Sequence, residues 1–112
     1  MRSVTINELV TESHNTAVDK GWWEEPRSFG ELIALIHSEL SEALEDYRNG
    51  FAANQIYYGD GQKPRGVPIE LADVLIRIGD LCGYFGIDLE QAVKEKLQYN
   101  KGRPYRHGGK VI

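Results

Sequence analysis

The sequence is poor in cysteine and histidine and has no long hydrophobic run. Cys82 is the only cysteine and three residues are histidine, so an intrachain disulfide is excluded and a Cys and His zinc site is not indicated. Cys82 lies among Ile78, Leu81 and Phe85, which favours a packing role. No stretch approaches the roughly 18 apolar residues of a membrane helix, and no signal peptide is apparent. We therefore expect a cytoplasmic protein without membrane contact.

Length and charge set the next limits. A chain of 112 residues is expected to form one domain, residues 1–112, with one modest hydrophobic core. The formal net charge is −4, but residues 1–93 hold 7 basic and 16 acidic side chains, whereas residues 94–112 hold 6 basic and one acidic. An acidic body disfavours broad nucleic-acid binding. The basic tail at about 101–112 is equally compatible with local phosphate binding and with a solvated terminus.

Four segments have the apolar spacing of helices. The first runs from about Thr5 to Lys20 and has the weakest pattern. The second starts after Ser28, a capping residue followed three positions later by Glu31, and runs to Arg48 or Asn49. The remaining two are expected at about 68–85, opened by a proline and closed by a glycine, and at about 88–100.

The segment between the second and third helices, residues 51–67, is rich in Gly, Asn, Tyr and Pro. A connection of this length is either functional or partly disordered. No strand of convincing alternation appears anywhere in the chain. The expected architecture is therefore all-α, a compact bundle of about four helices.

Acidic residues recur at helical spacing on the second and third of these helices. Glu39 and Glu42 lie on one face at the edge of the apolar stripe of the second helix, whereas Glu45 falls on the opposite side. The third helix is apolar around most of its circumference, yet it carries one narrow polar stripe. That stripe consists of Glu70, Asp73, Arg77 and Asp80.

A buried helix carries ionisable groups at a high cost unless they meet opposite charge or a metal. If the two helices pack antiparallel, Glu39, Glu42, Glu70 and Asp73 converge. Carboxylates alone favour Mg²⁺, with Mn²⁺ as a possible substitute, and Mg²⁺ commonly binds carboxylates together with substrate phosphates. The simpler alternative is that the two glutamates form a surface edge and that Asp73 pairs with Arg77, one turn along.

The two motifs together resemble the MazG-like all-α nucleoside triphosphate pyrophosphohydrolases, whose mark is E-x-x-E followed by E-x-x-D on two packed helices. The match extends through residues 32–43 and 69–75 to Lys96, Asn100 and Arg103. The resemblance implies that Glu39, Glu42, Glu70 and Asp73 bind Mg²⁺, and that water releases pyrophosphate and a nucleoside monophosphate. It also implies that Lys96, Asn100 and Arg103 bind phosphate. Glu39 or Glu42 would serve as the catalytic base.

The resemblance further suggests that Trp22 or Trp23 stacks on the base, although core or dimer packing is the favoured role for at least one of them. Asp80 occupies a position where some relatives carry a base-contacting asparagine, so its acidic side chain puts that contact in question. Such domains are often homodimers or dimers of dimers, which would complete the small core. The nucleotide preferred, and hence the place in nucleotide house-cleaning, is left open.

Two other classes of protein compete with this interpretation. A noncatalytic helical interaction module would use the acidic edge to bind a basic partner and would need no metal. An oxygen-activating di-iron bundle usually requires Glu-x-x-His pairs, which His37 and His107 do not provide. The pyrophosphohydrolase is the preferred hypothesis.

Overall fold

The computed structural model describes residues 2–112, apart from the side chain of His107. Its long elements are four helices, as the sequence predicts. They are α1 (Ile6–Asp19), α2 (Phe29–Arg48), α3 (Val67–Phe85) and α4 (Leu89–Lys101). A single helical turn, α5 (Arg106–Gly109), follows near the carboxyl end. The prediction of an all-α chain is confirmed.

The helix boundaries follow from capping residues. The side-chain oxygens of Ser28 and Asp88 each accept a hydrogen bond from the backbone amide three residues on, at 3.1 and 3.0 Å, at the starts of α2 and α4. Pro68 lies in the first turn of α3, and Gly86 ends that helix with φ of 67°. The predicted ends therefore lie within about two residues of the observed ones.

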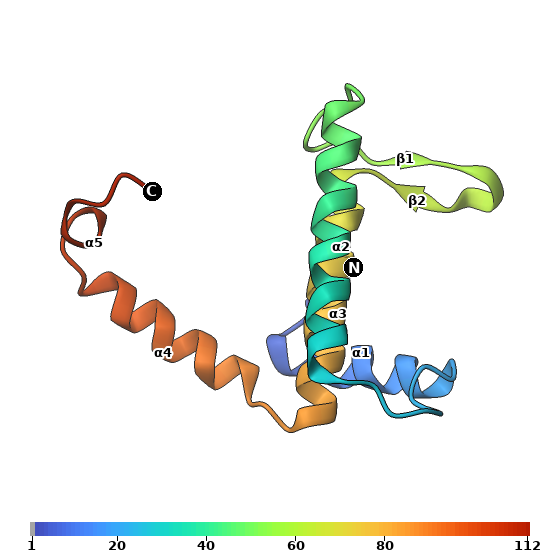
Figure 1. The fold of residues 1–112 in the computed structure, drawn as a ribbon, viewed down its shortest axis with the longest axis horizontal. Coiled ribbons are helices and arrows are strands. Elements are labelled where there is room, and N and C mark those ends of the chain that lie inside the picture. The colour runs from blue at the N-terminus through green and yellow to red at the C-terminus, as the bar shows by residue number, and fades with distance from the viewer. Residues whose placement is uncertain (1) are drawn as a thin grey trace.

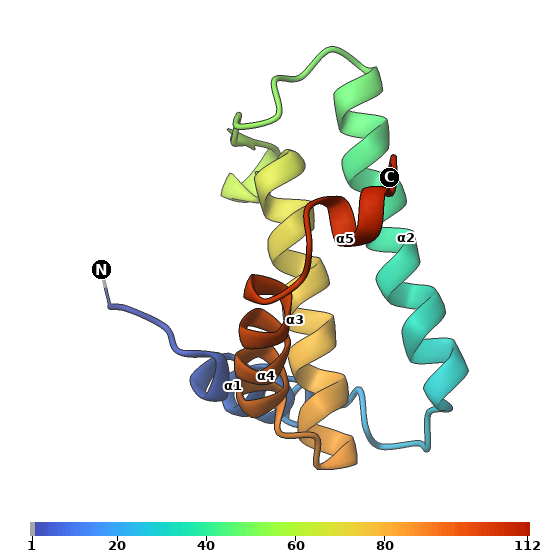
Figure 2. The same ribbon diagram turned by 90° about the vertical axis from the view of Figure 1, so that its left-hand side faces the viewer.

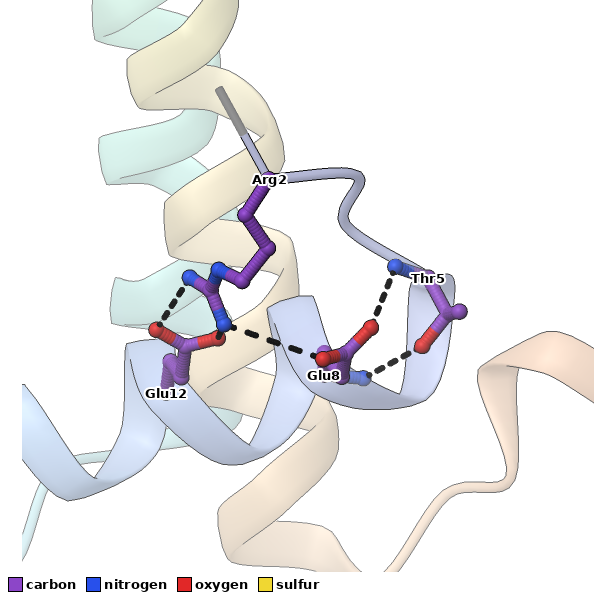
Figure 3. Close-up of polar contacts among 4 residues, drawn as sticks. All are labelled: Arg2, Thr5, Glu8 and Glu12. Atoms are coloured by element: carbon purple, nitrogen blue, oxygen red, sulfur yellow. Dashed lines mark hydrogen bonds and ion pairs between the residues drawn. The ribbon is translucent and has the colours of Figure 1, made fainter.

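The start of α1 has a complete capping box, which its weak apolar pattern did not reveal. Thr5 accepts a bond from the Glu8 amide at 3.1 Å, and the Glu8 carboxylate accepts one from the Thr5 amide at 2.9 Å (Figure 3). Arg2 binds both oxygens of Glu12 at 3.0 Å and lies 3.7 Å from Glu8. These exposed contacts fix the first two turns of the helix.

The body of the molecule consists of α2 and α3, which run antiparallel and side by side, with α1 crossing α3 near its carboxyl end (Figures 1 and 2). The buried cluster between them contains Leu32, Leu81 and Cys82. Burial of Cys82 confirms its predicted packing role and raises the pKa of its thiol. The antiparallel pair brings the two acidic motifs to the same level.

This core is small, and much apolar surface stays exposed. Leu44 on α2 is 60% exposed and Leu75 on α3 is 54% exposed. Exposed apolar area of this extent on both long helices is typical of a surface that another element covers.

The fourth helix does not lie along the α2–α3 pair. It packs against α1 and extends away from the body, and the α4–α5 arm, residues 89–112, forms a separate limb (Figure 1). The structure assigns no buried residue to α4. The arm carries the basic tail and several large apolar side chains, among them Leu97, Tyr99 and Tyr105.

The connection 51–67 contains a short hairpin, which the expectation of no strand did not include. Strand β1 (Tyr57–Tyr58) pairs antiparallel with β2 (Pro64–Arg65), and a turn of 3₁₀ helix, η1 (Asp60–Gln62), joins them. Two paired residues per strand are too few to produce an alternating pattern, so the sequence gives no strand signal. The hairpin projects beside the start of α3 (Figure 1). Among the described residues, we find no helix with the length and apolar character needed to cross a membrane.

Candidate metal and substrate site

The acidic motifs meet where α2 and α3 pack. One carboxylate oxygen from each of Glu39, Glu70 and Asp73 can be chosen so that all lie within 4.8 Å of one another. Glu39 comes from the middle of α2 and is only 8% exposed, whereas Glu70 and Asp73 lie on the first two turns of α3. This group of three, the carboxylate cluster, is the one set of potential metal ligands found among the described residues.

Glu70 is the least satisfied member of the cluster. Its Oε2 atom is buried and has no hydrogen-bond partner among the described residues. Burial raises the pKa of Glu70 to about 8, with further contributions from the nearby Glu42 and Glu39. An orphaned buried oxygen costs free energy unless a cation or a proton meets it. Without a metal, Glu70 therefore holds a proton at neutral pH.

Asp73 is affected in the same direction. Burial raises its pKa, the charge of Glu39 adds to the rise, and the charges of Arg77 and Lys63 oppose it. Lys63 comes from the hairpin between α2 and α3, so this long connection contributes a cation to the field of the cluster. Two of the three carboxyl groups, Glu70 and Asp73, thus have raised pKa values, chiefly because they are buried.

Glu39 differs because it already has a cationic partner. The Nε–H of Arg77 donates to Glu39 Oε1 at 2.9 Å. Burial alone would raise the pKa of Glu39, but the contributions of Arg77, Glu70 and Glu42 together outweigh burial and hold the pKa below its usual value. The sequence interpretation placed Arg77 in the polar stripe but considered only Asp73, on the same helix, as its partner. The ion pair in fact joins α2 to α3.

Glu42 lies beside the cluster without belonging to it. It is one turn after Glu39 on α2, exposed, and close enough to contribute to the raised pKa of Glu70. The four predicted ligands are therefore neighbours, with three converging and the fourth at the solvent edge.

The donor chemistry of the cluster fits a hard divalent cation. Its donors are all carboxylate oxygens, which suit Mg²⁺ or Mn²⁺. The unpartnered Glu70 Oε2 supplies an acceptor that protein hydrogen bonds do not satisfy. A metal ion held by these residues would favour their ionised forms, which burial and the neighbouring carboxylates now disfavour in Glu70 and Asp73.

A pocket of about 470 Å³ opens beside the cluster. Glu39 and Asp73 line one part of it, and residues of α1 and of the α1–α2 connection line the rest, including Lys20, Trp22 and Arg27. Its wall along α3 extends from Asp73 to Asp80, about 10 Å at helical rise. This volume lies in the range of small-molecule sites.

The two tryptophans have different surroundings. Trp22 is 62% exposed, lines the pocket and carries the Arg27 guanidinium 5.6 Å from its ring centre. Trp23 stacks on Tyr84 with ring centres 3.9 Å apart and donates to Asp80 Oδ1 at 2.9 Å. Trp23 is held within the protein, and Trp22 is the one that faces the pocket.

Asp80, the last acid of the polar stripe, has partners that the sequence did not suggest. Its Oδ1 also lies 2.8 Å from His14 Nδ1, so a histidine of α1 and a tryptophan of the α1–α2 connection meet the same carboxylate oxygen. The weak apolar pattern of α1 gave no indication of which face of that helix packs on α3. The contacts satisfy Asp80 within the fold while it lines the pocket.

The predicted phosphate-binding residues lie on the arm. Lys96 Nζ lies 5.0 Å and the Arg103 guanidinium carbon 5.5 Å from the ring centre of Tyr99, so these two cations lie near the same side chain of the arm. Asn100 is exposed on the same helix. Since α4 extends away from α2 and α3 (Figure 1), the arm does not bring this set to the carboxylate cluster of its own chain.

Comparison of the chain with models of protein families, with curated proteins and with solved structures finds no match. The observations that bear on function are therefore the carboxylate cluster, the adjoining pocket and the basic arm.

Proposed function

We propose that this protein is a magnesium-dependent nucleoside triphosphate pyrophosphohydrolase of the MazG-like kind. The observation that carries the proposal is the convergence of Glu39, Glu70 and Asp73 beside a pocket of about 470 Å³ that Glu39 and Asp73 line, with one buried oxygen of Glu70 lacking a partner among the described residues. Carboxylates that need a cation, beside space for an organic ligand, are what metal-assisted phosphate chemistry requires. The E-x-x-E and E-x-x-D motifs support the same assignment.

In this proposal the carboxylate cluster holds Mg²⁺, which would neutralise phosphate charge and lower the pKa of a bound water. Glu42 accepts the proton of the attacking water. It suits this role better than Glu39 because Glu39 is buried and already accepts a bond from Arg77. Cleavage of the bond between the α and β phosphates then gives a nucleoside monophosphate and pyrophosphate. The reaction class implies nucleotide house-cleaning.

Trp22 is proposed to stack on the nucleobase, because it lines the pocket and much of its ring is exposed. Trp23 supports it indirectly, since the contacts of Trp23 with Tyr84 and Asp80 fix the end of the α1–α2 connection. Asp80 is proposed to line the base end of the pocket. The distance along α3 from Asp73 to Asp80 corresponds to the separation of phosphates and base in a bound nucleotide.

We further propose that the protein acts as a homodimer, or a dimer of dimers, in which the arm of one copy lies against the body of another. The arm is basic, the body is acidic, and both expose large apolar side chains. In such an assembly Lys96, Asn100 and Arg103 would bind the phosphates of a substrate held by the partner's carboxylate cluster. An arm extended from its own body is compatible with this exchange.

The proposed activity is tested by incubating the protein with ribo- and deoxyribonucleoside triphosphates, with and without Mg²⁺, and separating products by ion exchange. Monophosphate plus pyrophosphate, dependent on Mg²⁺, is expected. Asp73→Asn is expected to lose both Mn²⁺ binding and turnover, whereas Glu42→Gln retains Mn²⁺ binding and loses at least about a hundredfold in kcat.

Glu45→Gln is the matched control, because Glu45 lies on the same helix and, among the described residues, its exposed side chain pairs only with the exposed Arg48. Its turnover should equal that of the wild type. Hydrolysis retained in both Glu42→Gln and Asp73→Asn would assign the activity to a contaminant. Absence of hydrolysis and of Mn²⁺ binding in the folded wild type would favour the helical interaction module.

A further inference from the structure

We propose that Arg77 is a triphosphate-binding residue, anchored by Glu39 and pointing its free edge into the pocket. This inference rests on the proposed function and adds a substrate contact that the acidic motifs do not contain. It concerns the one basic residue that hydrogen-bonds to the carboxylate cluster within the described part of the chain.

Arg77 contacts the carboxylate cluster and also lines the pocket. It lies one turn after Asp73 on α3, donates through Nε to Glu39 at 2.9 Å, and lines the same pocket as both acids. A substrate whose phosphates reach the carboxylate cluster must pass within reach of this side chain. The guanidinium is permanently charged and needs no proton exchange to act on phosphate.

The hydrogen bonds of Arg77 leave most of its donors available. A guanidinium has five N–H groups, and the contact with Glu39 uses the one on Nε. Among the described residues no other hydrogen bond or ion pair engages Arg77, and its side chain is 37% exposed. The paired Nη edge, which can bind two oxygens of a phosphate, therefore has no partner among the described residues, and Arg77 lines the pocket.

The single contact with Glu39 differs from a guanidinium bound through both edges, which would have fewer donors left for a ligand. Here one bond joins Arg77 to Glu39, while Asp73 keeps a raised pKa and Glu70 Oε2 has no partner within the described part of the chain. The anchor fixes the direction of the guanidinium and leaves its recognition edge open, which is the arrangement of an oriented ligand-binding arginine.

The assignment also provides phosphate recognition within one chain. Lys96, Asn100 and Arg103 lie on the arm and do not reach the carboxylate cluster of their own protomer. Arg77 is present at the site in a monomer as well as in an oligomer, so it would bind the phosphates nearest the metal. The arm residues would bind the phosphates farther from the metal.

The test uses inorganic tripolyphosphate, which probes phosphate recognition without a base. Its binding in the presence of Mg²⁺ is measured by calorimetry for the wild type, Arg77→Gln, Arg77→Lys and the control Arg48→Gln. Mn²⁺ binding without tripolyphosphate is measured on the same proteins. Arg77→Gln is expected to lower the affinity for tripolyphosphate at least about tenfold. Its affinity for Mn²⁺ is expected to change less than about threefold.

Arg77→Lys, which keeps the charge but loses the paired edge, should give an intermediate loss. Arg48→Gln should bind like the wild type, because Arg48 lies at the end of α2 with an exposed side chain. For turnover, the change in Arg77→Gln is expected in KM for the preferred nucleotide more than in kcat.

Unchanged tripolyphosphate affinity in a folded Arg77→Gln protein would overturn the inference. A parallel loss of Mn²⁺ binding would also overturn it, since Arg77 would then act only by holding Glu39 in place. Failure of the proposed function has a different signature, in which the wild type itself neither binds Mn²⁺ nor hydrolyses any nucleotide.

Discussion

At the scale of single residues, the carboxyl group of Glu70 makes the stability of the folded, metal-free protein depend on pH. Its pKa of about 8 exceeds the ordinary value of 4.5, so the proton on Glu70 stabilises the folded, metal-free protein. That contribution is complete below pH 4.5 and is lost as the pH rises to about 8, because the unfolded chain binds fewer protons in this range. Thermal unfolding between pH 5 and 9 should show the metal-free wild type losing stability relative to Glu70→Gln as the pH rises.

The same proton must leave when a metal binds. We expect the Mn²⁺ affinity to rise by up to about tenfold per pH unit between pH 6 and 8 and to level off above pH 8. Calorimetry in buffers of different ionisation enthalpy should record release of about one proton per ion at pH 6.5 and almost none at pH 9. A flat affinity across this range would mean that Glu70 is not a ligand.

The adjacent tryptophans provide a second residue-scale prediction. Trp23→Ala removes the stacking on Tyr84 and the bond to Asp80, so it should destabilise the protein by about 3 kcal/mol. Trp22→Ala changes an exposed ring, so its melting temperature should stay close to that of the wild type while KM for nucleotide rises. Denaturant unfolding and steady-state kinetics on both variants check the contrast. Equal loss of stability would contradict the separation of roles.

At this scale the sequence predicts more reliably which residues share a site than which side-chain atoms contact one another. Helical spacing placed Glu39 and Glu42 on one face of the second helix, and Glu70 and Asp73 on one stripe of the third, because this depends only on periodicity. It did not give the pairing of Arg77 with Glu39 or of Asp80 with His14. Those contacts depend on the rotation and height of one helix relative to another, which side-chain spacing along a single helix does not contain.

At the scale of elements, α1 packs closely on α3 because two glycines remove side chains from the interface. A Cβ atom at Gly83 would lie 2.5 Å from His14 Cβ, and one at Gly79 would lie 3.0 Å from Ser13 Oγ. Neither contact can be relieved without moving α1, because the obstructing atoms lie close to its backbone. This close crossing brings His14 to Asp80 and closes one side of the pocket.

Gly83→Ala is therefore expected to destabilise the protein by about 1–3 kcal/mol through overpacking. Gly30→Ala is the matched control, since a Cβ there meets nothing within 4 Å, and it should be neutral or stabilising by up to about 1 kcal/mol. Denaturant unfolding of both variants provides the measurement. If Gly83→Ala were as stable as Gly30→Ala, the helix crossing would be looser than described.

The elements themselves were largely predictable. Capping residues such as Ser28 and Asp88 act on backbone amides three positions away, so their effect is local and visible in the sequence. The β1–β2 hairpin was missed because its pairing is too short to have a periodicity. The direction of α4 was also beyond prediction, since one turn at residues 86–88 decides whether that helix folds back or extends.

At the scale of the whole molecule, the uneven charge and the extended arm predict an assembly that can be tested by mixing two inactive variants. Asp73→Asn disables the carboxylate cluster but leaves the arm intact, and Arg103→Ala weakens the arm but leaves the cluster intact. If the arm serves the partner's site, a mixed dimer holds one complete site, built from the intact cluster of the Arg103→Ala chain and the intact arm of the Asp73→Asn chain. Random reassociation of equal amounts should then restore about a quarter of wild-type activity.

The outcome of mixing distinguishes an arm that serves the partner's site from an arm that serves its own chain. If each arm serves its own chain, or the protein is a monomer, mixing restores nothing beyond the sum of the two variants. Light scattering should give a mass near twice 12.7 kDa or a multiple of it for the wild type, and the association should weaken with salt because it joins a basic arm to an acidic body. A monomer at all salt concentrations would leave the exposed apolar side chains of α2 and α3 without the partner proposed for them, and Arg77 as the principal phosphate contact.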